Sequence, residues 1–151
     1  MRKPVCPVRQ SADGLLFEFF SEGPKGSIKK RVVFQSTHNP YPCNFALGDV
    51  NEANEVDDLA QTNNGDVMLV MATVANALFA FFEHYSTCFV FLEGGTNQSN
   101  WLYQRVIERY GPDVVAKTWF RDGLKSYNET YLSPEPINSV IQYSYFLIGL
   151  Q

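Results

Sequence analysis

Cysteine and histidine are scarce in this sequence. Its three cysteines, Cys6, Cys43 and Cys88, are an odd number, lie far apart and form no C-x-x-C pair. The pattern indicates neither a disulfide framework nor a zinc site, and it favours a reducing compartment. We expect a cytoplasmic protein that carries no metal and no cofactor.

We expect neither a signal peptide nor a segment that spans a membrane. Pro7 and Arg9 interrupt any apolar run near the start. The most apolar segment, residues 67–82, is shorter than the ~20 residues that a bilayer requires, and it contains Thr73 and Asn76. We expect no membrane contact and interpret this segment as the core helix of a soluble protein.

Positive charge is scarce. The net charge is −4, and residues 49–66 contain six acidic and no basic side chains. An acidic total disfavours contact with a phosphate backbone, so we do not expect nucleic-acid binding. Hydrophobic residues make up 45% of the chain, which is enough for one packed core, and residues 1–151 are predicted to form a single domain.

The acidic segment begins like a calcium-binding loop. Asp49 and Asn51 have the spacing of the first two ligands, but Ala53, Asn54 and Ala60 stand where a ligand, the turn glycine and the bidentate glutamate are required. We therefore expect a solvated turn that links two strands and holds no metal.

Alternating apolar residues predict strands in the first third of the chain. Residues 15–20 and 27–34 are two β-type runs separated by a Gly-Pro-Lys-Gly turn, which is typical of a hairpin, and residues 41–47 predict a third strand. In the second run Lys29 and Arg31 share one face, which we interpret as a solvated basic face.

The clearest helix signal begins at Asn63-Asn64-Gly65-Asp66. Apolar residues then recur at three- and four-residue spacing from Val67 to Tyr85, so they line one stripe that faces the core. We expect Asn64 or Asp66 to cap this helix by accepting hydrogen bonds from the amides of its first turn.

The second half of the chain predicts a central strand at residues 87–92 and a polar turn at 93–100. A helix follows at residues 101–110, ended by Gly111-Pro112, and the last strands are residues 114–120 and 143–148. The elements predict an α+β fold with a mainly antiparallel sheet of about six strands packed against two helices, in the order β-β-β-β-α-β-α-β-β.

Several short motifs occur along the chain. They are Glu22–Lys30, Phe45–Asp49, Asn63–Asp66, Val70–Ala75 and the Leu-Tyr-Gln of residues 102–104. Together they resemble a family of bacterial proteins of unknown function, mostly from Bacteroidota, over nearly the whole chain. The resemblance implies a shared fold and no established activity.

The chain departs from that family in the turn before the second helix. Members carry two arginines there, in Gly-Ser-Thr-Pro-Ala-Arg-Thr-Arg-Leu-Tyr-Gln, where this chain has Ser99 and Trp101. Two guanidinium groups suit bidentate contact with an anion, and Ser99 and Trp101 cannot replace them.

No catalytic set is visible in the sequence. His38 lies in a predicted loop, and His84 lies in the last turn of the first helix, where it suits the negative end of the dipole. We therefore interpret the protein as a non-catalytic interaction component of a small bacterial two-gene module, of the toxin–antitoxin or anti-phage type. Its partner would be another protein or a second copy, and the many aromatic residues suit such a surface.

The order of elements also resembles the Gcn5-related acetyltransferase fold, in which amides at the start of a helix hold the coenzyme pyrophosphate. An acyltransferase-like enzyme or a ligand-binding domain is therefore the alternative. The Asp66 carboxylate opposes it, because it would repel a pyrophosphate.

We predict a functional edge where the turn before each helix brings polar and aromatic residues together. Its members are Asn63, Asn64, Asp66, Gly94, Gly95, Thr96, Asn97, Trp101 and Tyr103.

Overall fold

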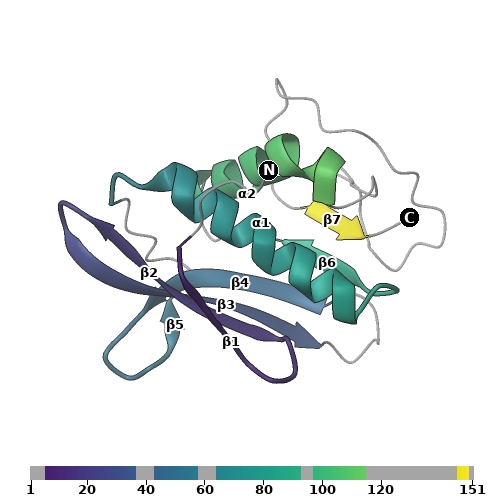
Figure 1. Ribbon diagram of the computed structural model, residues 1–151, viewed down its shortest axis with the longest axis horizontal. Coiled ribbons are helices and arrows are strands. Elements are labelled where there is room, and N and C mark those ends of the chain that lie inside the picture. The colour runs from purple at the N-terminus through teal and green to yellow at the C-terminus, as the bar shows by residue number, and fades with distance from the viewer. Residues whose placement is uncertain (1–5, 37–42, 58–63, 93–96, 115–145, 150–151) are drawn as a thin grey trace.

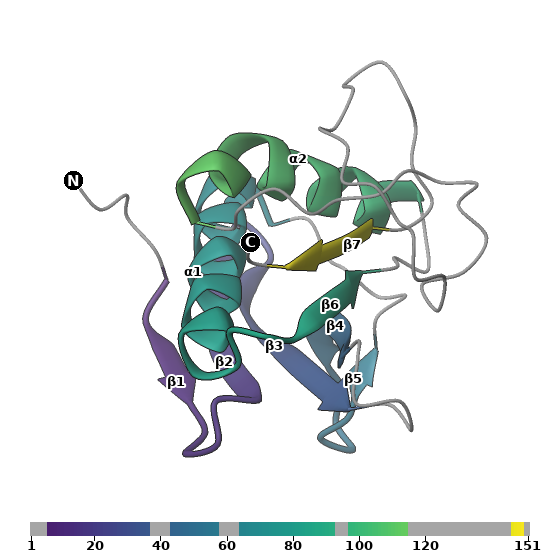
Figure 2. The ribbon, with the colours of Figure 1, turned by 90° about the vertical axis from the view of Figure 1, so that its right-hand side faces the viewer.

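Two helices lie on one face of a mainly antiparallel sheet (Figures 1 and 2). The computed structural model describes residues 6–36, 43–57, 64–92, 97–114 and 146–149. Within them the predicted fold class is confirmed, as is the order of strands and helices.

The described residues form a sheet of seven strands, in the spatial order β1-β2-β3-β4-β6-β7, with β5 paired to β4. All pairs of described strands are antiparallel except β4 and β6, which are parallel over only three residue pairs. The strands are β1 Val8–Gln10, β2 Leu16–Gly23, β3 Gly26–Ser36, β4 Cys43–Val50, β5 Val56–Asp57, β6 Phe89–Leu92 and β7 Phe146–Gly149, and the helices are α1 Val67–His84 and α2 Asn97–Val114.

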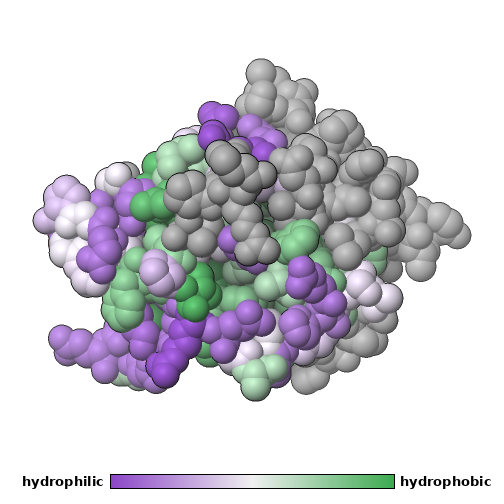
Figure 3. All heavy atoms as spheres, in the orientation of Figure 1, coloured by the Kyte–Doolittle hydropathy of each residue, from purple (hydrophilic) through white to green (hydrophobic). Residues whose placement is uncertain are grey.

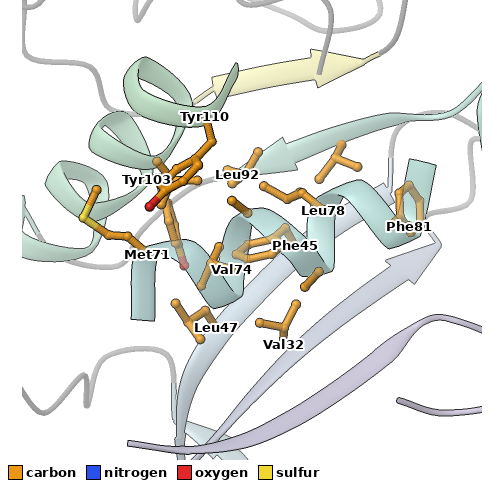
Figure 4. Close-up of a cluster of buried hydrophobic side chains, with 14 of the residues drawn as sticks. Val32, Phe45, Leu47, Met71, Val74, Leu78, Phe81, Leu92, Tyr103 and Tyr110 are labelled. Atoms are coloured by element: carbon orange, nitrogen blue, oxygen red, sulfur yellow. The ribbon is translucent and has the colours of Figure 1, made fainter. Parts of the chain in front are cut away.

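The predicted core helix is confirmed and extends to His84. Its buried side chains pack on the face of the sheet that carries the inward residues of β2, β3 and β4, and Figure 4 shows Val74 and Leu78 directed toward that face. By length and hydropathy α1 resembles a membrane span, but 56% of its apolar window is buried inside the protein. The helix is therefore apolar because it is surrounded by other elements.

Aromatic rings join the helix to the sheet. Phe81 stacks on Phe34 of β3 with ring centroids 4.2 Å apart, and Tyr85 stacks on the other side of Phe81 at 5.0 Å. On α2, Tyr103 meets Phe45 of β4 edge-to-face at 5.4 Å. Such pairs stabilise the core by about 0.5–1.5 kcal/mol each beyond the apolar area that they bury.

Several predicted boundaries are wrong. α2 begins at Asn97 and continues through Gly111 and Pro112 to Val114. The burial of Tyr110 against the core outweighs the local helix breakers. β4 extends to Val50, and β6 begins two residues later than expected. Residues 143–145 of the strand predicted at 143–148 lie outside the described residues, and β7 is described from Phe146. Residues 115–120 of the strand predicted at 114–120 lie outside the described residues.

Replacing Phe81 by alanine should lower the free energy of unfolding by about 3–5 kcal/mol, because the side chain is fully buried between two rings. The matched control is Phe79→Ala on the same helix, which should change stability by less than about 1 kcal/mol because Phe79 is exposed. Urea denaturation followed by circular dichroism measures both. Equal losses would contradict the packing described here.

Candidate functional site

The tip of the β2–β3 hairpin meets the start of α1 at the left of Figure 1. We call this contact the hairpin–helix junction; it consists of residues 21–26 and 64–66. Asn64 lies at its centre and is almost fully buried. Its Oδ1 accepts from the Lys25 N–H at 2.7 Å, and its Nδ2 donates to the carbonyls of Gly26 at 2.8 Å and Ser21 at 3.3 Å. The side chain thereby fixes the hairpin.

Asp66 holds the same hairpin from the side of β2. The buried Ser21 hydroxyl donates to the carboxylate and lies 2.8 Å from both oxygens, and the Glu22 N–H donates to Oδ2 at 3.2 Å. Asp66 is the N-cap residue of α1, yet its side chain makes no capping hydrogen bond to the helix. The predicted capping role of Asn64 and Asp66 is therefore wrong, since both side chains are used across the junction.

Two glycines allow this close approach. A Cβ on Gly23 would lie 1.8 Å from the Asn64 carbonyl oxygen, so no other residue fits there without moving the backbone. Gly65 has φ +78°, in the left-handed region that side chains disfavour. The Gly-Pro-Lys-Gly turn and the Asn-Gly-Asp segment therefore form the two sides of the hairpin–helix junction.

A buried ion pair lies on the core face of the sheet near the junction. Lys30 is almost fully buried, and its Nζ lies 2.7 Å from Asp49 Oδ1, which is directly opposite in the pairing of β3 and β4. The basic residue of β3 that turns inward is therefore neutralised within the sheet. Asp49 is a strand residue, and no group of three or more metal-ligating side chains occurs in the described ranges.

Apolar side chains point outward where the junction ends. Val67, Met68 and Leu69 form the first turn of α1, and each is at least 36% exposed. We call them the apolar triplet. Figure 3 shows hydrophobic residues over this part of α1, beside the polar hairpin. Clustered apolar side chains at a surface are typical of contact sites in general.

The start of α2 belongs to the same end of the sheet. β6 runs parallel to β4 and ends at Leu92, and α2 begins at Asn97. Trp101 is 48% exposed, with the Arg105 guanidinium 5.4 Å from its ring centroid. Tyr103, by contrast, lies in the core with 1% of its surface exposed, so its ring does not reach the surface.

The structure brings together only part of the predicted functional edge. Asn64 and Asp66 share the junction, and Trp101 is at the surface of α2. Asn63, Gly94, Gly95 and Thr96 lie outside the described residues, and for Asn97 only its place at the start of α2 is described. The edge as a whole remains a prediction.

Sequence reasoning missed Ser21, the hydroxyl that Asp66 binds. One signal pointed to it, because Phe17, Phe19 and Ser21 alternate along one strand and all face inward. A polar residue in an inward position requires a buried partner. Within the described part of the chain, every buried polar side-chain atom has one.

Of the two histidines, His38 lies outside the described residues. His84 lies in the last turn of α1 as predicted, with Nδ1 3.1 Å from the Ala80 carbonyl oxygen. Next to it the Tyr85 hydroxyl donates to the Asp13 carbonyl at 2.6 Å, which fixes the β1–β2 loop. His84 thus contacts its own helix, and its neighbour Tyr85 packs the end of that helix against the β1–β2 loop.

The outer face of the sheet carries a second charged group. Glu18 Oε2 accepts from Arg31 Nε at 2.7 Å and lies 3.5 Å from Lys29 Nζ, and Arg31 also donates to the carbonyl and side chain of Asn54. Burial by itself raises the pKa of Glu18, but the hydrogen bond from Arg31 and the charges of Arg31 and Lys29 outweigh it and lower that pKa. The predicted basic face is thus partly neutralised.

Comparison with known protein families finds one that matches the chain. The model of a family of unknown function, DUF6934, matches residues 3–151. The chain belongs to this family. No curated protein and no solved structure matches it. The resemblance to an uncharacterised family is confirmed, and membership of that family assigns no activity to the junction.

Asn64→Ala should lower the free energy of unfolding by about 3 kcal/mol, because it leaves the Lys25 N–H and the Gly26 carbonyl without their partner. Asn76→Ala on the exposed face of α1 is the matched control and should change it by less than about 0.5 kcal/mol. Thermal and urea denaturation of both variants test this. A small effect of Asn64→Ala would mean that the junction does not hold the hairpin.

Acid should destabilise the protein partly through Glu18. Its folded pKa is lowered, so the stability that it contributes is present above its ordinary pKa of 4.5 and is lost as the pH falls through the lower folded value. Between about pH 7 and about pH 3 the wild type should lose more stability than Glu18→Gln, as measured by urea denaturation. Identical losses would rule out a contribution from this carboxylate.

Proposed function

We propose that this protein acts without catalysis, by binding a protein partner as one component of a small bacterial two-gene module. The observation that carries the proposal is that polar and apolar side chains at the hairpin–helix junction face different ways. The polar side chains of the junction make hydrogen bonds within it: Ser21 to Asp66, and Asn64 to the main chain of the hairpin. What faces outward beside them is the apolar triplet.

The chemistry of the described residues supports a binding role. A catalytic acid or base must reach a substrate, whereas the carboxylates of Asp66, Asp49 and Glu18 are bonded within the fold. An exposed methionine, leucine and valine, with Trp101 and Arg105 on the next helix, are residue types that contribute strongly to protein interfaces.

Affinity purification from native cells at endogenous expression should capture a partner with the wild-type protein. Met68→Ser combined with Leu69→Ser should reduce its recovery by about tenfold, because a loss of ~1.4 kcal/mol of interface burial has that effect. Trp101→Ala tests the start of α2 in the same way.

Phe79→Ser is the matched control for this experiment. It replaces another exposed apolar residue of α1, ten residues after Leu69 and nearly three helical turns further along, and should leave recovery unchanged. Each variant must keep the melting temperature of the wild type. Recovery that does not depend on the triplet would remove this surface from the proposal, and an absence of any specific partner would remove the proposed function.

A second candidate is an acyltransferase-like enzyme or a domain that binds a coenzyme. One observation favours it: β4 pairs with β6 only from Cys43 to Phe45, while β4 continues to Val50, and α1 connects the two strands. This arrangement agrees with the expected resemblance to the Gcn5-related fold. The Asp66 carboxylate at the start of α1 opposes an anionic ligand there.

Coenzyme A separates the two candidates. If the second is right, millimolar coenzyme A or acetyl-coenzyme A should raise the melting temperature by mass action. An unchanged melting temperature together with partner capture would favour the interaction role.

A further inference from the structure

We propose that the outer edge of β1 binds an extended, acidic segment of a partner protein, which joins the sheet as an additional strand. This inference rests on the proposed function and names the kind of partner. β1 is the first strand in the spatial order, so its outer side faces no other strand among the residues that the structure describes (Figure 2). All three of its residues, Val8, Arg9 and Gln10, are exposed.

The main chain of β1 offers hydrogen-bonding groups on that side. The Ser11 N–H donates to the Leu16 carbonyl at 2.9 Å, and Arg9 lies opposite Glu18 in the same antiparallel register. Because successive residues of a strand direct their N–H and C=O groups to opposite sides, those of Val8 and Gln10 point away from β2. Neither residue has a main-chain partner in the described part of the chain.

The segment before β1 turns away from the sheet. Pro7 would lie opposite Phe20, but it has no N–H to donate. The Cys6 N–H instead donates to Thr73 Oγ1 on α1 at 2.9 Å, and Cys6 is buried there. β1 therefore begins only at Val8. Phe20 of β2, just beyond that first residue, remains 50% exposed, and a side chain of an incoming strand can pack on it.

The charge next to this edge determines the chemistry of the partner. On the outer face of the sheet Arg9 is exposed and lies opposite Glu18, whose carboxylate is already bound by Arg31 and Lys29. Arg9 makes no ion pair with any described residue. Three cations thus surround one carboxylate, and an Asp or Glu on the added strand opposite Arg9 would complement them.

A second copy of this chain fits the edge less well. Antiparallel pairing of two β1 strands about a two-fold axis, centred on the middle residue of the strand, would place Arg9 directly opposite Arg9 of the other copy. Like charges in that position destabilise a strand pair. The edge therefore favours a different, acidic chain.

Selection from a phage library of random peptides of about twelve residues tests the inference with the full chain. We expect enrichment of proline-poor peptides that contain Asp or Glu. Gln10→Pro removes the outward N–H and should weaken their binding by about tenfold or more, whereas Gln10→Ala keeps that N–H and should bind as the wild type does. Melting temperatures show whether each variant is folded.

Two further measurements distinguish strand addition from contact elsewhere. Arg9→Glu should lose the acidic peptides and bind the same peptides after their acidic residue is changed to lysine. In hydrogen exchange, bound peptide should protect the amides of Val8 and Gln10 and leave that of Arg9 unchanged, since Arg9 faces β2.

Several results would overturn the inference: no enriched peptide, equal binding by Gln10→Pro and Gln10→Ala, or no new protection at Val8 and Gln10. These failures differ from failure of the proposed function. A cellular partner that is captured equally by wild type and Gln10→Pro leaves the function intact and rejects this edge. Peptides that bind the edge when no cellular partner exists reject the function alone.

Discussion

Burial of α1 against the sheet is the constraint on which the other features depend. The helix supplies apolar side chains to β2, β3 and β4 below it and to α2 beside it, and Phe81 stands between Phe34 and Tyr85. Because β4 and β6 run parallel, the chain must cross the sheet between them, and α1 is that crossing. The position of α1 therefore determines at which end of the sheet α1 begins and, through β6, at which end α2 begins.

The hairpin–helix junction follows from this placement. The start of a buried helix brings Asn64 and Asp66 against the tip of the β2–β3 hairpin, where main-chain groups of Ser21, Lys25 and Gly26 need partners. With these polar side chains bound to the hairpin, Asp66 does not cap the first turn of the helix, and the apolar triplet of that turn faces outward. A structural requirement thus produces the surface that we assign to a partner.

β3 places its basic side chains on opposite faces of the sheet with different results. Lys30 turns inward and is neutralised by Asp49, whereas Lys29 and Arg31 turn outward and share Glu18. Removing one member of a buried pair leaves an uncompensated charge, so the inward pair constrains the register of β3 and β4. The outward group and Arg9 place more positive than negative charge near β1, which is the basis of the acidic partner that we propose for this edge.

Local pattern determined much of this protein. Helical spacing located α1, alternation located β2 and β3, and the motifs indicated membership of a family of unknown function. The sequence also marked Asn64 and Asp66 as important, but it assigned them to capping, because spacing along a chain reports only neighbours along that chain. Their true partners are about 40 residues earlier. The burial of Lys30 and Tyr103, and the position of β1 at one end of the described strands, were likewise decided by strand register and helix packing, which only the tertiary structure sets.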